Sequence, residues 1–171
     1  MGELRTVPMV MQAPIGPATT PRLVAAGSSA AGTAYLAATE ADVHPVYRDR
    51  IIEADGTDTE LTELFDIGWP NAPHRVLRNE TFEAWSAAGS PPAPNRPGEG
   101  DPVATRDGRT VVRYSDEQPT RNTEGDIEAM ALYAGVGVGA IARVEDAATI
   151  TERLLAATGA LRAASTPSSV A

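Results

Sequence analysis

The chain has 171 residues, 42 % of them apolar, so it can bury the core of one domain but is short for a (β/α)8 barrel of ~250 residues. Its net charge of −9, with no Lys/Arg cluster, argues against nucleic-acid and anionic-membrane partners. The absence of cysteine excludes disulfides and thiolate chemistry, and without a run of ~20 apolar residues or a cleavable leader we expect a cytoplasmic protein that spans no membrane.

The first 27 residues predict a strand, a loop and a helix. The apolar run at 7–12 is typical of a buried strand. Thr20 and Pro21 suit the start of a helix, because Thr20 can accept from a free backbone N–H and Pro21 has no donor to lose. The loop between the strand and the helix contains Ala13, Pro14, Ile15 and Gly16.

The next segment predicts a second strand and a second helix. Residues 33–37 are apolar and short enough for a strand. A helix is expected to begin at Pro45 and to end before Gly56. Its buried side carries Tyr47, Ile51 and Ala54 at helical spacing. Residues 58–65 do not decide between strand and helix.

The middle of the chain predicts a short helix, a loop and a hairpin. Asn79 can cap a helix that ends at Gly89. Residues 90–102 are rich in Pro and Gly and predict a loop or an extended linker. Asp107-Gly108 between two apolar runs indicates a two-residue hairpin turn.

The C-terminal part predicts two amphipathic helices and a frayed end. Asp126 can cap a helix with four apolar residues on one face, which are Ile127, Met130, Ala131 and Ala134. The last helix is expected from about Glu145 to Ala163, followed by a frayed end at 166–171.

Five segments have a more specific sequence. They are PMVMQAPIGPATTPRLVAA at 8–26, GTAYLAATEAD at 32–42, DIGWPNAPHRVLRN at 66–79, RYSDEQP at 113–119 and GDIEAMALYAG at 125–135. Together they resemble the nitronate monooxygenases. The resemblance implies an FMN-binding TIM-type barrel that oxidises an alkyl nitronate to a carbonyl compound and nitrite with molecular oxygen.

Central segments of that family, which supply a glycine-rich loop for the phosphate and, in many members, a catalytic histidine in a Gly-Gly-His context, have no counterpart in this sequence. We therefore expect an α/β fold that is an incomplete remnant of the barrel, as a single truncated domain. Residues 1–27 would give the first strand and helix, and residues 32–171 the closing strand, the C-terminal helices and a β-hairpin. Two strands cannot close a barrel, so we expect them to pair with each other and the enzymatic activity to be impaired or lost.

The resemblance also implies the position of an FMN site. The loop Ala13, Pro14, Ile15 and Gly16 would lie beside the flavin ring, and Gly32 and Thr33 would hold the FMN phosphate. Residues 125–135 are followed by Val136 and Gly137, where relatives have polar groups. Without a ligand, the same segments suit a strand-to-helix turn and an amphipathic core helix, and both interpretations stay open.

No catalytic residue and no metal ligand is assigned. His44 and His74 lack flanking glycines and are expected to be structural or solvent-facing. The pairs Asp49/Glu53 and Glu60/Glu63 suit solvated surfaces better than metal sites. A second hypothesis is a non-catalytic module that pairs with itself or with a full-length relative through exposed strand edges.

Overall fold

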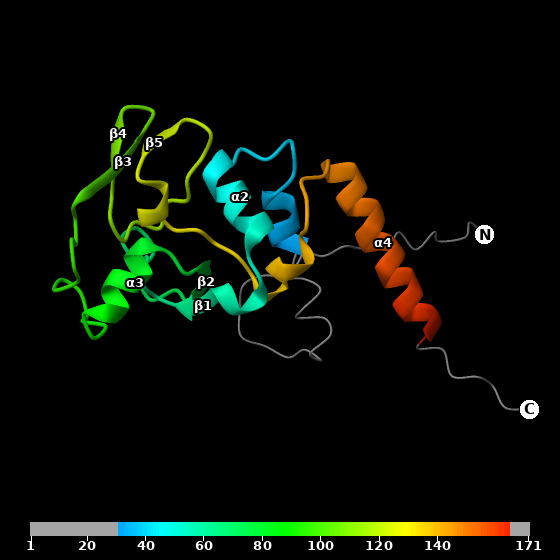
Figure 1. Ribbon diagram of the computed structural model, residues 1–171, viewed down its shortest axis with the longest axis horizontal. Coiled ribbons are helices and arrows are strands. Elements are labelled where there is room, and N and C mark those ends of the chain that lie inside the picture. The colour runs from blue at the N-terminus through cyan, green and yellow to red at the C-terminus, as the bar shows by residue number, and fades with distance from the viewer. Residues whose placement is uncertain (1–30, 165–171) are drawn as a thin grey trace, which may run out of the picture.

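The structure is a computed structural model that describes residues 31–164, with side chains from residue 31 to residue 156. A helix over residues 31–36 comes first. The labelled elements follow in chain order: α2 (Pro45–Glu53), the 3-10 helix η1 (Gly56–Asp58), β1 (Thr59–Thr62), β2 (His74–Leu77), α3 (Glu80–Ala87), β3 (Pro102–Arg106), β4 (Arg109–Val112), β5 (Thr123–Gly125), the 3-10 helices η2 (Ile127–Ala129) and η3 (Val136–Ala140), and α4 (Ala147–Ala164). The strands gather at one end of the molecule and α4 lies at the other (Figure 1).

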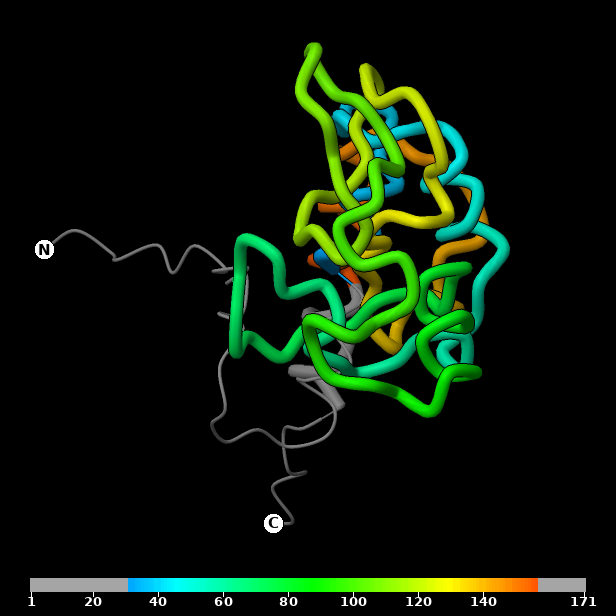
Figure 2. The backbone as a smooth tube through the Cα atoms, turned by 90° about the vertical axis from the view of Figure 1, so that its left-hand side faces the viewer, coloured from blue at the N-terminus to red at the C-terminus, as the bar shows by residue number. Residues whose placement is uncertain are grey.

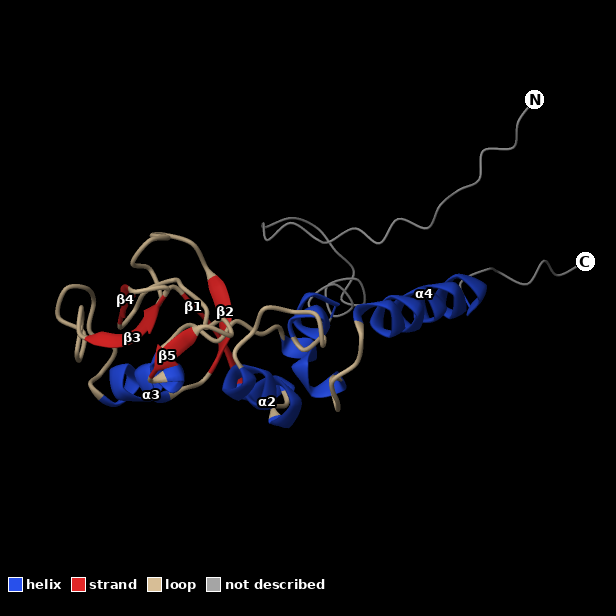
Figure 3. Ribbon diagram, turned by 90° about the horizontal axis from the view of Figure 1, so that it is seen from above, coloured by secondary structure: helices blue, strands red, loops and turns tan. Residues whose placement is uncertain are grey.

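Two small antiparallel sheets replace the expected barrel strands in the described residues. One sheet pairs β1 with β2, with Thr59 opposite Leu77, and the other has the order β4-β3-β5. Figure 3 shows both sheets well separated from α4. A TIM-type barrel is built from parallel strands, and none of these three strand pairings is parallel. The described part is therefore a mixed α/β unit, and a barrel is not among its elements.

The closing strand predicted at 33–37 is wrong, because residues 31–36 form a helix. Ala37 N donates to Thr33 O at 3.2 Å, which is helical pairing. The buried residues of this stretch are Thr33, Ala34, Ala37 and Ala38. That spacing places them on one side of a helix and not alternately on two faces of a strand. The expected pairing of a closing strand with the first strand is lost with it.

The helix predicted at Pro45 is confirmed. α2 begins after His44, whose Nδ1 accepts from Val46 N at 3.2 Å. Pro45 occupies the first helical position, where a missing N–H is harmless. Tyr47 and Ile51 are fully buried one helical turn apart, so α2 turns one side into the core.

The short helix and the hairpin are also confirmed. Asn79 Oδ1 accepts from Phe82 N at 3.1 Å and caps α3. The hairpin joins β3 to β4 through Asp107 and Gly108, whose φ angles of 52° and 76° are those of a type I′ turn. Residues 58–65, which the sequence left undecided, contain strand β1.

The helix predicted from Asp126 to Gly135 is wrong beyond its first turn. Asp126 Oδ1 accepts from Ala129 N as expected, but the helix is only the short η2. Residues 130–134 are extended and run beside β2, since Leu77 N donates to Leu132 O at 2.8 Å and Ala134 N to Arg75 O at 3.1 Å. Both faces of this segment are buried, so its apolar residues satisfy a helical and an extended pattern equally well.

Two hydrophobic clusters lie on opposite sides of β2 and residues 130–134. The larger one, which we call the large cluster, contains Tyr47 and Ile51 of α2. From β2 and residues 130–134 it also contains Leu77, Met130, Leu132 and Ala134. Val76 and Ala131 face the other way into a smaller group, which we call the aromatic cluster. The aromatic cluster comprises Leu64, Phe65, Val76, Tyr114 and Ala131, with Phe82, Trp85 and Tyr133 packed against it.

The last predicted helix is confirmed as α4. Asp146 Oδ1 accepts from Thr149 N at 2.8 Å and Glu40 accepts from Ala147 N, so two carboxylates lie at the positive end of the helix. Ile150, near the start of α4, is buried in the large cluster and so packs this end of the helix against it. Among the described helices, none combines the length and apolarity that crossing a bilayer requires.

Candidate functional site

Part of the predicted FMN site lies outside the described residues. The loop of Ala13, Pro14, Ile15 and Gly16, the strand at 7–12 and the helix that starts at Thr20 all precede residue 31, and the end at 166–171 follows residue 164. The flavin-facing loop therefore stays a prediction. Gly32, Thr33 and the segment that ends at Gly135 are described.

The structure brings Thr33 and Gly135 together, although they are 102 residues apart in the chain. Gly135 N donates to the Thr33 hydroxyl at 3.0 Å, and Thr33 is only 4 % exposed. Gly32 precedes this contact on the exposed side of the helix, where a Cβ would meet no described atom within 4 Å. The hydroxyl predicted to hold a phosphate thus joins helix 31–36 to the segment after residues 130–134.

The glycine-rich stretch after Gly135 packs against backbone. A Cβ on Gly56 would lie 2.7 Å from Val136 O, and a Cβ on Gly139 would lie 3.3 Å from Asp55 Cα. Glycine at these positions allows η3 to approach η1 closely. Val136 itself is 47 % exposed and offers no polar atom on its side chain. These glycines therefore serve chain packing and not contact with a flat ring.

Both histidines of the chain have structural roles. His44 caps α2 through Nδ1. His74 is 4 % exposed in β2, where its Nε2 lies 3.3 Å from Phe65 N and its Nδ1 lies 2.8 Å from Ala72 O. Both positions agree with the prediction that the two histidines are structural or solvent-facing.

Among the titratable groups of the described residues, two buried tyrosines have the largest pKa shifts. Burial raises the pKa of Tyr47, and the nearby Tyr133 raises it further. Burial and the charge of Asp116 raise the pKa of Tyr133 to about 12. The Tyr47 hydroxyl donates to Tyr133 O, and the Tyr133 hydroxyl to Asp116 O at 2.8 Å. Both phenols stay protonated near neutral pH and donate to backbone, so neither suits a general base.

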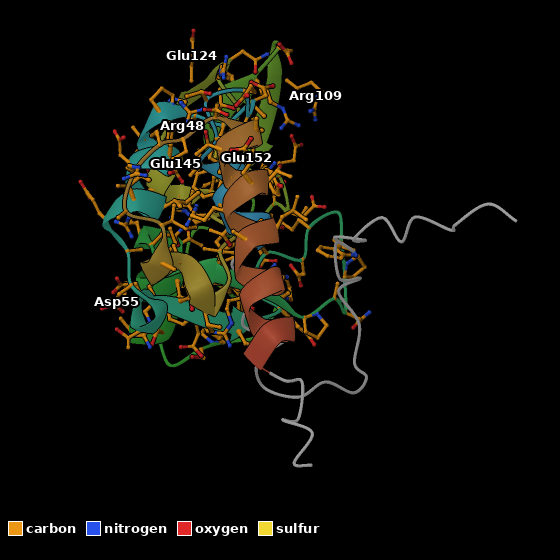
Figure 4. All side chains as sticks on the ribbon, turned by 90° about the vertical axis from the view of Figure 1, so that its right-hand side faces the viewer. Arg48, Asp55, Arg109, Glu124, Glu145 and Glu152 are labelled. Carbon is orange, nitrogen blue, oxygen red and sulfur yellow. The ribbon has the colours of Figure 1, made fainter. Side chains whose placement is uncertain are left out.

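The charged surface residues do not converge on one place. Figure 4 places Asp55 at the end of the molecule opposite Arg109 and Glu124. Asp49, Glu53 and Glu63 are exposed, and within the described residues no group of three or more His, Asp or Glu is arranged to hold a metal ion. A hollow of about 230 Å³ is lined by Arg50, Glu53, Ala54 and Asp58. That volume is below the ~300 Å³ of the smallest usual ligand clefts.

Sequence reasoning missed the most buried ionic group of the described residues. Arg96, inside the Pro/Gly-rich loop, is 7 % exposed and pairs with Asp66 and Glu99. Its partner Asp66 is 30 residues away in the sequence. The available signal was an arginine in an otherwise uncharged run of eight residues, 90–97, which does not by itself indicate burial.

Comparison with known proteins gives only remote similarities. No protein-family model matches the chain, and no curated protein matches its sequence. FabK from Thermotoga maritima is 23 % identical over 77 % of this chain and 38 % of its own, with a TM-score of 0.47. A single-residue mutant of the same protein is 22 % identical over 75 % of this chain and 33 % of its own, with a TM-score of 0.42. The chain spans less than two-fifths of the length of either structure, and neither similarity assigns an activity to it.

Proposed function

We propose that this chain is a relative of the FMN-dependent nitronate monooxygenases in which oxidation of alkyl nitronates is impaired or lost. The described residues would serve as a packing unit and not as a redox centre. The observation that carries the proposal is the bond between the Thr33 hydroxyl and Gly135 N, which joins the two described segments expected at the cofactor.

The segments that carry the family resemblance supply much of the core. Buried residues lie in each of the three family-like segments 66–79, 113–119 and 125–135. They include His74, Val76, Leu77, Asn79, Tyr114, Ser115, Ile127, Ala129, Met130, Ala131, Leu132 and Ala134. Retention of these residues maintains a fold, and it supports descent from the family without requiring a retained reaction.

The described residues do not fit FMN in the way the family resemblance implies. A phosphate is held by several free backbone N–H groups together with hydroxyl or cationic donors. Here Gly135 N already donates to the Thr33 hydroxyl, Thr33 is only 4 % exposed, and Gly56 and Gly139 face protein backbone. No reaction step is therefore assigned to these residues, and the chemistry of a complete enzyme would depend on groups beyond them.

The proposal is tested on the full chain. We expect the purified protein to be colourless, to leave FMN fluorescence unquenched at micromolar flavin, and to consume no oxygen with an alkyl nitronate. A protein that copurifies with flavin and shows nitronate-dependent oxygen uptake contradicts the proposal. Addition of riboflavin, which lacks the phosphate, separates ring binding from phosphate binding.

Substitution of Thr33 by valine distinguishes packing from cofactor binding. The change keeps the side-chain shape and leaves Gly135 N without its acceptor, so we expect Thr33→Val to lower the free energy of unfolding by about 1–3 kcal/mol. Thr110→Val, at an exposed position on β4, is the matched control and should change stability by less than about 0.5 kcal/mol. If Thr33→Val and Thr110→Val were equally stable, the Thr33 hydroxyl would have no structural role.

A second candidate function is self-association through the β1 region. Leu61, Ile67 and Trp69 are 58 %, 36 % and 41 % exposed, on β1 and on the β1–β2 loop. Figure 2 shows this loop projecting from the body of the molecule. Among residues 31–164, β1 pairs with a strand on one side only, which leaves an edge able to pair with a second chain.

Sedimentation of the full chain at increasing concentration tests this candidate. Self-association should weaken in Trp69→Ser and persist in Val46→Ser, a control on α2 with a similarly exposed apolar side chain. A protein that sediments as a monomer at every concentration contradicts self-association.

A further inference from the structure

Residues 90–101, between α3 and β3, form a segment with little backbone attachment to the rest of the molecule, along the side occupied by α3 and β3 (Figure 1). We call this segment the strap. Within it, Asn95 N, Glu99 N and Asp101 N all donate to carbonyls of the strap itself. Its backbone bonds to neighbouring elements lie at its two ends: Ser90 N donates to Trp85 O of α3 at 3.0 Å, and Arg113 N, just after β4, donates to Asp101 O at 2.9 Å. The strap is therefore fixed mainly by side chains.

Arg96 is the one buried residue of the strap. Its guanidinium donates to Asp66 Oδ1 at 2.8 Å, to Leu64 O at 2.9 Å and to both oxygens of Glu99 at 2.6 and 3.0 Å. It also lies over the ring of Tyr114, 4.3 Å from the ring centre. A planar, permanently charged guanidinium is suited to this combination of forked bonds and ring stacking.

Two weaker attachments flank Arg96. Trp85 Nε1 donates to Pro91 O at 2.9 Å, and the Tyr114 hydroxyl donates to Pro97 O at 2.8 Å. Both rings are part of the aromatic cluster or packed against it. The strap consequently covers Tyr114 and Trp85 and contributes no apolar residue to the cluster itself.

We propose that the strap is a conformational device: it opens as a unit over the aromatic cluster, independently of both sheets, and Arg96 is the latch that holds it shut. Segments with few buried contacts open locally at lower free energy than the core strands do. Removal of one partner from a buried ion pair leaves the others uncompensated, so loss of the Arg96 cation should act on the strap first.

Acid should weaken the same latch. The bonds from Arg96 lower the pKa of Glu99 below its ordinary value of 4.5, against the opposing effect of burial. A carboxylate with a lowered pKa stabilises the closed strap above pH 4.5, and this contribution is lost as the pH falls further. The ionisable groups that face this site are Arg96, Asp66, Glu99, Tyr114, Arg113 and Asp101.

The test uses the full chain with Trp69→Phe, so that Trp85 is its only tryptophan. Acrylamide quenching of Trp85 and hydrogen exchange of residues 90–101 report on the strap, and exchange of residues 74–77 reports on β2. Arg96→Met is compared with Arg109→Met, which removes an arginine whose side chain is 60 % exposed. If the Arg96→Met variant fails to fold, Arg96→Lys takes its place, because lysine keeps the positive charge but cannot make the forked hydrogen bonds of the guanidinium.

We expect Arg96→Met, or Arg96→Lys to a smaller extent, to speed exchange of the strap at least about tenfold while β2 exchange is unchanged. Arg109→Met should change neither. Below pH 4.5 quenching of Trp85 should rise before far-ultraviolet circular dichroism changes, and Glu99→Gln should remove this step. The proposal is overturned if strap and β2 exchange rise together, if neither rises, or if Trp85 exposure coincides with global unfolding.

Discussion

The two hydrophobic clusters on either side of β2 are stabilised in different ways. The large cluster is mostly aliphatic and gathers residues from helix 31–36, α2, α4 and the sheets. The aromatic cluster is smaller and is surrounded by polar groups that are themselves buried, such as His74 and Arg96. The stability of the large cluster depends on the apolar area that it buries. The stability of the aromatic cluster depends on hydrogen bonds and charge as well.

This difference predicts where the protein responds to a change. Deletion of an apolar group should matter most in the large cluster, because its residues link most of the helices. Replacement of a polar group at constant size should matter most around the aromatic cluster, where it leaves buried groups such as Phe65 N without a partner. Each prediction below separates these two responses.

Ile51→Ala should have the largest effect. Ile51 is fully buried in the large cluster, and its truncation should lower the free energy of unfolding by about 2–5 kcal/mol. Chemical denaturation measures this change, with Trp85 fluorescence and circular dichroism expected to report one shared transition. Leu61→Ala, at a residue 58 % exposed, is the control and should stay within about 0.5 kcal/mol of the parent.

His74→Phe should have an intermediate effect on the other side of β2. Phenylalanine keeps an aromatic ring of similar size but leaves Phe65 N and Ala72 O without their partner, so we expect a loss of about 1–3 kcal/mol. His44→Phe removes only one exposed cap bond and should lose less than about 1 kcal/mol. If the two variants were equally stable by denaturation, polar bonding would not distinguish the aromatic cluster.

A rise in pH should have the smallest effect of the three up to pH 10.0, since nothing changes until tyrosine ionises. The pKa of Tyr133 is raised from 10.0 to about 12, so the unfolded chain loses its phenolic proton first. Stability is therefore full below pH 10.0 and falls as the pH rises towards about 12. Phenolate absorbance during an alkaline titration measures this, and Tyr133→Phe should remove part of the late step.

Local signals in the sequence predicted the elements whose ends are set by a few adjacent residues. His44 and Pro45 start α2, Asn79 caps α3, and Asp107-Gly108 turns the hairpin. Each depends on a cap or a backbone angle that one or two residues determine, so no knowledge of the rest of the fold is needed.

The wrong predictions fall in two short and mostly apolar stretches. Residues 33–37 and 130–134 contain too few polar residues for a period of 2 to be told from one of 3.6. The chain packs the first as a helix and the second as an extended segment, and only the neighbouring elements decide between them. The Thr33–Gly135 bond and the Arg96–Asp66 pair join residues far apart in sequence, which a single sequence does not reveal.

Thermal unfolding of the full chain with and without FMN tests the central claim most directly. A ligand that binds the folded state stabilises it by about 2.7 kcal/mol at a hundred times its dissociation constant, so even moderate binding raises Tm. We predict the same Tm at every FMN concentration, because Gly135 N already donates to the Thr33 hydroxyl and Thr33 is only 4 % exposed. A Tm that rises with FMN but not with riboflavin would contradict the account.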